Sequence, residues 1–85
     1  MFTNKTNDGR NNVCGVQIAH YRKNMGKSQR ELADRLQILG LDVDKNAVQR
    51  MEAGKRFVTD IELMYLAKAL HITYEQLLGG EPSDE

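Results

Sequence analysis

Three short motifs of one kind constrain the fold of this chain more than any other feature. Each consists of a hydroxyl residue followed three positions later by Glu or Gln: Ser28 with Glu31, Thr59 with Glu62, and Thr73 with Gln76. This spacing is typical of a capping box. In it the hydroxyl accepts a hydrogen bond from an unpaired backbone N–H, and the Glu or Gln side chain reaches back to the N–H of the hydroxyl residue. The sequence therefore predicts that a helix starts at each motif.

Apolar side chains recur at helical spacing after each box. They are Leu32, Ala33, Leu36 and Leu39 after the first box, Leu63, Leu66, Ala67 and Leu70 after the second, and Leu77 and Leu78 after the third. Gly40 can end the first of these helices as a left-handed cap. Upstream, the spacing of Cys14, Ile18 and Tyr21 predicts a shorter helix that ends near Met25 and Gly26.

A fifth helix is predicted from Lys45 to Ala53, with Asp44 as its N-cap and Gly54 at its end. Val43 is placed to pack against Val48 as a hydrophobic staple. The predicted fold class is all-α, a compact arrangement of five short helices with no strand. We expect a flexible N-terminal tail over residues 1–12, one domain over residues 13–78, and a flexible acidic tail over residues 79–85.

The size and composition exclude several classes of protein. A chain of 85 residues buries too little surface for a large substrate cavity. It has no apolar run long enough to span a bilayer and no secretion signal, so we expect a cytoplasmic protein. The single cysteine, Cys14, has no partner for a disulfide or a zinc site, and we interpret it as a small buried apolar residue. We expect no metal and no cofactor.

The two sides of the predicted helix from Lys45 to Ala53 differ in chemistry. The side predicted to face inward carries Ala47, Val48 and Met51. The other side carries only hydrogen-bonding side chains: Lys45, Asn46, Gln49 and Arg50. Such a face is either an ordinary solvated surface or a surface that binds a polar partner.

Charge is distributed unevenly along the chain, although the net charge is zero. Nine basic and five acidic residues lie between Val16 and Arg56, whereas from Phe57 onward one lysine stands against six acidic residues. The basic half favours a nucleic-acid partner, and solvated helix faces that happen to differ would give the same pattern.

The chain resembles the phage-repressor and Cro type of helix-turn-helix domain, also called the xenobiotic-response-element (XRE) family. The matching motifs are Cys14-Gly15-x-x-Ile18-x-x-Tyr21-Arg22, Ser28-Gln29-x-Glu31-Leu32-Ala33-x-x-Leu36, Val48-x-x-Met51-Glu52-x-Gly54-Lys55-Arg56, and Leu63-x-x-Leu66-Ala67-x-Ala69-Leu70-x-Ile72-Thr73-x-x-x-Leu77-Leu78. The resemblance implies a lambda-repressor-like bundle in which the second and third helices form the helix-turn-helix. It also implies a regulator, in most cases a repressor, that binds double-stranded DNA.

Two features depart from the family pattern. The connection from Gln37 to Val43 is about five residues longer than usual, because Gln37 stands where most members have the glycine that ends the second helix. A second helix extended by about one turn, followed by a longer turn, would accommodate it. Lys27 occupies a position that is usually apolar in the family, and it could instead face a phosphate.

The resemblance implies a role for each polar residue of the motif. Lys45, Asn46 and Arg50, with Gln49 next, are the expected base contacts, since amides can pair with adenine and basic side chains with guanine in the major groove. The expected phosphate contacts are Gln29, Lys27, Lys55 and Arg56, and for Arg30 and Arg35 a solvated role fits at least as well.

Arg22 and Glu52 form an ion pair in similar proteins, which would lock the recognition helix to the scaffold, and the alternative is two unrelated surface charges. The family usually binds paired half-sites as dimers, so we expect a homodimer. Its contact surface would come from the last helix, around Tyr74, Leu77 and Leu78, unless these residues belong to the core.

Two other classes of function are alternatives to a DNA-binding regulator of this kind. One is an antitoxin-like regulator that binds a partner protein through its acidic C-terminal part. The other is an enzyme, and the sequence gives little support for it. Ser28 is accounted for as a cap, and neither His20 nor His71 has an obvious catalytic partner, so we interpret them as a surface residue and a helix-end residue. The sequence has no Gly-rich phosphate loop.

Overall fold

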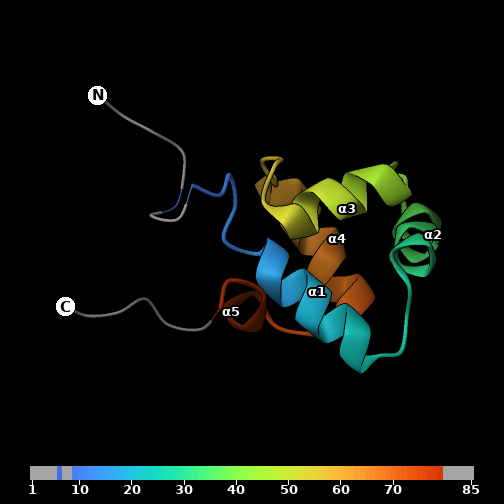
Figure 1. Cartoon of the computed structure of the whole chain (residues 1–85). Coiled ribbons are helices and arrows are strands. Elements are labelled where there is room, and N and C mark those ends of the chain that lie inside the picture. Colours follow the sequence, from blue (N-terminus) through green and yellow to red (C-terminus); the bar gives the residue numbers. More distant parts are fainter. Residues whose placement is uncertain (1–5, 7–8, 80–85) are drawn as a thin grey trace.

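The computed structural model describes residue 6 and residues 9–79, and places five helices in them. These are α1 (Gly15–Asn24), α2 (Gln29–Leu39), α3 (Lys45–Ala53), α4 (Asp60–Leu70) and α5 (Tyr74–Leu77). The described residues contain no strand, so the predicted all-α class with five helices is confirmed. In Figure 1, α2 lies at one end of the molecule and α5 at the other, with α1 between them.

All three predicted capping boxes are present. At the start of α2, Ser28 Oγ accepts from the Glu31 N–H at 3.0 Å, and Glu31 Oε1 accepts from the Ser28 N–H at 2.7 Å. The boxes that open α4 and α5 have the same reciprocal geometry. Each box satisfies two N–H groups that the helix itself cannot pair, which explains why these helices begin where they do.

The apolar faces of the helices meet in one core. α1 packs against α3, α4 and α5, while α2 packs against α3 and α4. The core residues are Cys14, Ile18, Leu32, Ala33, Leu36, Val43, Ala47, Val48, Met51, Leu66, Ala67, Ala69, Leu70 and Leu77. Cys14 is buried as predicted, and burial raises the pKa of its thiol to about 11. Leu77 is fully buried, so it belongs to the core and cannot form part of a dimer surface.

The long connection between α2 and α3 is ordered by local hydrogen bonds. α2 continues to Leu39 and ends at Gly40, whose φ of 114° is left-handed and favours glycine. The Gln37 amide then donates to the Val43 carbonyl at 2.7 Å, and Asp44 caps α3 by accepting from the Ala47 N–H at 2.8 Å. The extension of the second helix by about one turn is therefore confirmed.

The last three residues of the predicted N-terminal tail are hydrogen-bonded to the helical part of the chain. Residues 10–12 fall within the predicted N-terminal tail, but they form hydrogen bonds with residues 51–56, about forty positions away along the chain. Bonds over such a separation leave no periodic signal in the local sequence, which is why the predicted tail extended to residue 12. Residues 80–85 of the predicted C-terminal tail lie outside the described residues.

Candidate nucleic-acid interface

The helix α3 presents four hydrogen-bonding side chains on one exposed face. Ala47, Val48 and Met51 are buried, which fixes the rotation of the helix about its axis. Lys45, Asn46, Gln49 and Arg50 are consequently all exposed. An open hollow of about 300 Å³ along this face is lined by Asn46, Gln49, Arg50, Ala53 and Lys55. The structure therefore brings together the four side chains expected to contact bases.

A buried ion pair connects α3 to α1. Arg22 Nε donates to Glu52 Oε2 at 2.7 Å, and Arg22 Nη2 donates to Glu52 Oε1 at 3.0 Å. Both side chains are about nine-tenths buried, and the hydrogen bonds that Arg22 donates to the Glu52 carboxylate raise the pKa of its guanidinium, so the cation is favoured. Arg22 Nη1 also donates to the Lys27 carbonyl at 2.8 Å, which extends the connection to the turn before α2.

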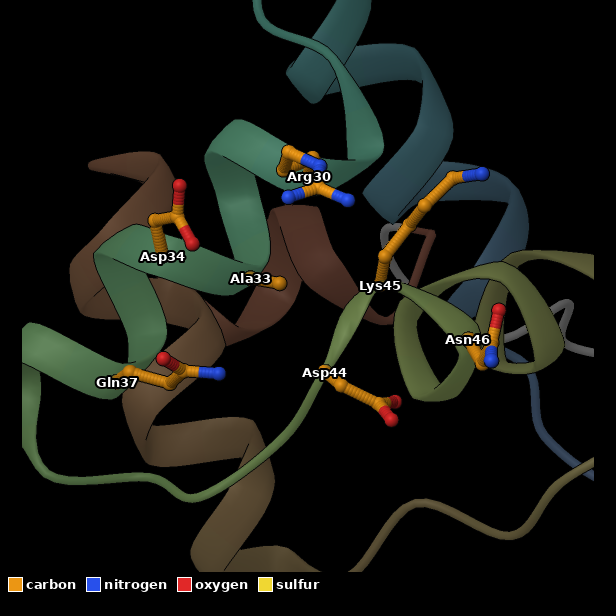
Figure 2. A pocket seen from close by; sticks show the side chains of 7 residues that line it. All are labelled: Arg30, Ala33, Asp34, Gln37, Asp44, Lys45 and Asn46. Carbon is orange, nitrogen blue, oxygen red and sulfur yellow. The ribbon is translucent and has the colours of Figure 1, made fainter.

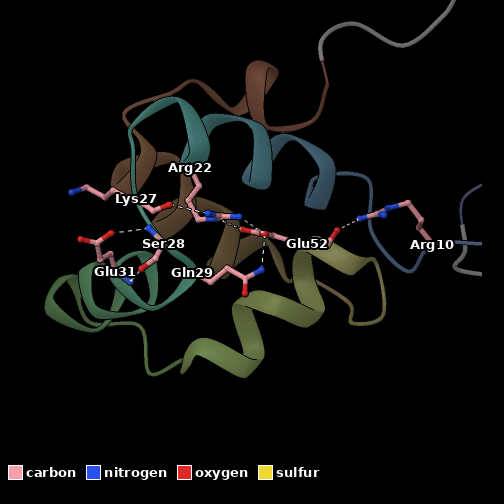
Figure 3. Close-up of polar contacts among 7 residues, drawn as sticks. All are labelled: Arg10, Arg22, Lys27, Ser28, Gln29, Glu31 and Glu52. Atoms are coloured by element: carbon pink, nitrogen blue, oxygen red, sulfur yellow. Dashed lines mark hydrogen bonds and ion pairs between the residues drawn. The ribbon is translucent and has the colours of Figure 1, made fainter.

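Gln29 also joins this ion pair, a contact that no local sequence pattern predicts. Its Nε2 donates to Glu52 Oε1 at 2.9 Å, so Glu52 is held by α1 and α2 together (Figure 3). The Gln29 side chain remains partly exposed in the first turn of α2. The expected contact of Gln29 with a phosphate remains a prediction. The structure also shows a hydrogen bond from this side chain within the domain.

Arg56 has a different environment from the one expected of a phosphate ligand. Its guanidinium donates to both carboxylate oxygens of Glu62, at 3.0 and 2.9 Å. This pairing raises the pKa of Arg56. Partial burial alone would raise the pKa of Glu62, but hydrogen bonds from Arg56 and Thr59 outweigh it and lower that pKa. This pairing was not predicted, because in the sequence Glu62 is already accounted for as part of the capping box of α4.

The two expected lysine contacts also differ in environment. Lys55 is exposed directly after α3, beside the hollow lined by Asn46, Gln49 and Arg50. Lys27 is partly buried in the turn before α2. Lys55 thus continues the exposed α3 face, whereas Lys27 precedes the helix-turn-helix in the sequence, just before α2.

A second hollow, of about 420 Å³, separates α2 from the start of α3. Figure 2 shows Arg30, Asp34 and Gln37 along α2, with Asp44, Lys45 and Asn46 across from them. Arg30 therefore lines the same hollow as two expected base contacts, Lys45 and Asn46, although a solvated role was expected for it at least as much as a phosphate contact. Its position depends on how the long connection spaces α2 from α3, which local sequence patterns do not indicate.

Apolar side chains are exposed on another surface, formed mainly by α4 and α5. Ile61, Met64 and Tyr74 are each more than half exposed. With Leu39, Tyr65 and Lys68 they line a hollow of about 390 Å³. We call these six residues the α4–α5 patch. Tyr74 of the expected dimer surface belongs to it, and Leu78 is also exposed.

The described residues contain neither a candidate membrane-spanning helix nor a candidate metal-binding cluster. None of the helices there is long and apolar enough to cross a membrane. No group of three or more His, Cys, Asp or Glu side chains in this part of the chain could hold a metal ion.

Comparison with known proteins places residues 18–77 in the helix-turn-helix family. Among solved structures, the restriction-modification controller protein C.AhdI from Aeromonas hydrophila is 29% identical with a TM-score of 0.67, and the match covers 76% of this chain and 91% of that one. A hypothetical transcription factor, NHTF from Neisseria, is 27% identical with a TM-score of 0.68, covering 78% and 70% of the two chains.

The clp gene regulator ClgR from C. glutamicum also shares the fold. It is 23% identical with a TM-score of 0.68, and the match covers 78% of this chain and 79% of that one. No curated protein sequence matches the chain significantly.

Proposed function

This chain belongs to the XRE-type helix-turn-helix family of DNA-binding transcription regulators, and from that premise we propose that it is a repressor that reads a specific sequence in the major groove with α3. The observation that carries the proposal is the exposed face of Lys45, Asn46, Gln49 and Arg50 on a helix whose other side is buried in the core. The major groove is wide enough for one α-helix, and its base edges differ between the four base pairs.

Each side chain of that face suits a particular base. Asn46 and Gln49 can bond adenine through N6 and N7, with the amide accepting from N6 and donating to N7. Arg50 and Lys45 can donate to O6 and N7 of guanine. Arg30 lies across the hollow from Lys45, and we propose that it extends this contact surface to the DNA backbone beside the bases.

Phosphate contacts would supply most of the affinity. Lys55 and Lys27 border the motif at its two ends, and Gln29 lies at the N-terminus of α2, where backbone N–H groups favour an anion. Arg56 is the weakest of the expected candidates, because a phosphate would have to compete with Glu62 for its guanidinium.

We further propose that the protein acts as a homodimer in the cytoplasm. Two copies related by a twofold axis would present their α3 helices to half-sites about 34–36 Å apart, which gives enough base pairs to define a site in a genome. The α4–α5 patch supports this proposal, because exposed apolar side chains gathered on one surface favour a protein contact. A dimer bound over a promoter would repress by occupying it.

Selection of bound sites from random duplex DNA tests the proposal. We expect enrichment of one motif with two similar halves. Affinity for it should fall as salt rises, with a slope of about −0.9 in log K against log salt for each phosphate contacted. Enrichment of no motif together with a flat salt response would contradict it.

A further inference from the structure

The C-terminal end of α3 is held by a segment that lies outside the family match. Residues 10–12 precede the matched range of 18–77, yet all three form hydrogen bonds with the end of α3 or the loop after it. We call Arg10, Asn11 and Asn12 the N-terminal clamp. Its position beside α3 can be followed in Figure 1, where the segment before α1 approaches the end of α3.

The clamp donates to carbonyl groups at the end of α3 and in the loop that follows it. Arg10 Nη2 donates to the Glu52 carbonyl at 2.7 Å (Figure 3), and the Asn11 N–H donates to the Gly54 carbonyl at 2.8 Å. Asn12 Nδ2 donates to two carbonyls, that of Met51 at 3.0 Å and that of Arg56 at 2.7 Å. The last carbonyls of a helix lack an N–H partner four residues further on, and Arg10 supplies a donor to one of them, that of Glu52. The Met51 carbonyl also accepts from the Gly54 N–H at 3.1 Å, so Asn12 adds a second donor there. These bonds stabilise the end of α3 and the turn that follows.

The same segment is joined to α1. Asn12 Oδ1 accepts from the Gly15 N–H at 2.8 Å, so one amide side chain links the start of α1 to the end of α3. A side chain at Gly15 would have its Cβ in steric conflict with the Met51 carbonyl oxygen, and one at Gly54 would meet Arg10 Cζ at 2.6 Å. Glycine at these two positions therefore allows the close approach that the clamp requires.

We infer that the N-terminal clamp sets the angle at which α3 enters the major groove, and that Arg10 and Asn12 are positioning residues for base reading. This inference rests on the proposed function. Glu52 is held on both sides: Arg22 and Gln29 bind its carboxylate, and Arg10 binds its carbonyl. A helix of nine residues is about 13 Å long, so a tilt of about 5° at one end moves the other by about 1 Å, enough to misalign a base contact.

Arg10 acts through the helix and not on DNA. Its Nη2 is committed to the Glu52 carbonyl, and its Nε–H is buried with no hydrogen-bond partner within the described residues. A lysine at this position would keep the charge and one donor without that buried N–H. The two possible roles of Arg10, positioning and phosphate contact, differ in their dependence on salt.

The experiment compares the 85-residue wild-type chain with Arg10→Ala, Arg10→Lys, Asn12→Ala and the control Lys55→Ala. Affinity is measured for the selected site and for a scrambled duplex over a range of salt, below the melting temperature of each variant. We expect Arg10→Ala and Asn12→Ala to lower the ratio of specific to non-specific affinity about tenfold, the size of one mismatched contact, with the salt slope unchanged. Arg10→Lys should keep most of the ratio, and Lys55→Ala should lower the slope by about one without changing the ratio.

Two results would overturn the inference. One is an unchanged ratio in both alanine variants. The other is an equal loss of affinity for both duplexes in Arg10→Ala, together with a salt slope that is lower by about one. That result would make Arg10 a phosphate ligand.

Hydrogen exchange gives a readout without DNA. The amides of Gly54 and Lys55 should exchange faster in Arg10→Ala and Asn12→Ala while those of α4 are unchanged. Unchanged exchange at Gly54 and Lys55 would also overturn the inference. If wild type selects no site, the proposed function fails and hydrogen exchange still tests the clamp. If Asn12→Ala does not fold, the two Arg10 variants carry the test.

Discussion

Lys55 and Arg56 are adjacent basic residues with different surroundings. Lys55 is exposed beside the α3 face, whereas Arg56 is only about one-quarter exposed and paired with Glu62. Lys55→Ala should weaken binding to all DNA sequences alike and lower the salt slope by about one. Arg56→Ala should instead lower the free energy of unfolding by about 1 kcal/mol, because Glu62 loses its partner. Chemical denaturation and DNA titrations separate the two effects, and equal effects of both variants on the salt slope would contradict this assignment.

The contribution of the Arg22–Glu52 ion pair to stability can be separated from its role in orienting α3. Glu52→Ala should destabilise the fold by about 3 kcal/mol, since it leaves the buried Arg22 cation without its carboxylate. The double variant Arg22→Met with Glu52→Leu should recover most of that loss, because apolar side chains pack where the ions lay.

We expect the double variant to bind its site with reduced preference over a scrambled duplex, because α3 has lost the bonds that orient it. Denaturation and binding measured on the same preparations check this expectation. A double variant with wild-type preference would show that the pair has no orienting role.

At the scale of helices, the sequence predicted most of the fold because each helix begins with a local signal. Ser28, Thr59 and Thr73 each form a cap with a residue only three positions away, so the sequence alone contains the pattern. Gly40 and Gly54 end α2 and α3 as left-handed caps for the same local reason. Helical periodicity within α3 then predicts which four of its polar residues are exposed.

The contacts that the sequence did not indicate join residues far apart in the chain. Arg10 and Asn12 bond to the end of α3, and Gln29 bonds to Glu52, across separations that no periodic pattern spans. Asn12 does carry a weak local signal, because an asparagine three residues before Gly15 can accept from its N–H as a cap does. Such long-range hydrogen bonds depend on how the packed helices meet, and only the folded structure displays them.

The capping box of α4 predicts a dependence of stability on pH. The lowered pKa of Glu62 means that its ionised form stabilises the fold above the unfolded-state pKa of about 4.3, and that this contribution is lost as pH falls through the lower folded-state value. Glu62→Gln should therefore be less stable than wild type at neutral pH by about 1 kcal/mol and should lose less stability on acidification.

Glu31→Gln is the matched control, because Glu31 occupies the same position in the exposed box of α2 without an arginine bonded to its carboxylate. The difference in stability between Glu31→Gln and wild type should be smaller than the difference between Glu62→Gln and wild type. Thermal melts from about pH 7 to pH 3 measure both variants. Identical acid profiles for wild type and Glu62→Gln would contradict the role assigned to the Arg56–Glu62 pair.

The whole molecule has two surfaces of different chemistry, and we propose a different binding partner for each. The polar face of α3 is proposed for DNA, and the α4–α5 patch for a second copy of the chain. Met64→Glu or Tyr74→Glu should turn a dimer into a monomer, because each places a charge in the apolar patch. Ile38→Glu is the control, since Ile38 is 84% exposed and does not line the patch.

Sedimentation equilibrium of wild type and these variants measures the state of association. A wild-type monomer at the concentrations that bind DNA would contradict the proposed homodimer. Co-purification of a different protein in equal amount from the native host would favour the antitoxin-like alternative.

The central claim is that α3 reads bases, and the most direct test is site selection with wild type and Asn46→Ala side by side. Asn46 is exposed at the start of α3 and can pair with one adenine. We expect Asn46→Ala to select the wild-type motif with preference lost at one position in each half, at a cost of about 1–3 kcal/mol for the original site. A variant that selects the unchanged motif, or that loses affinity equally for every sequence, would contradict the claim.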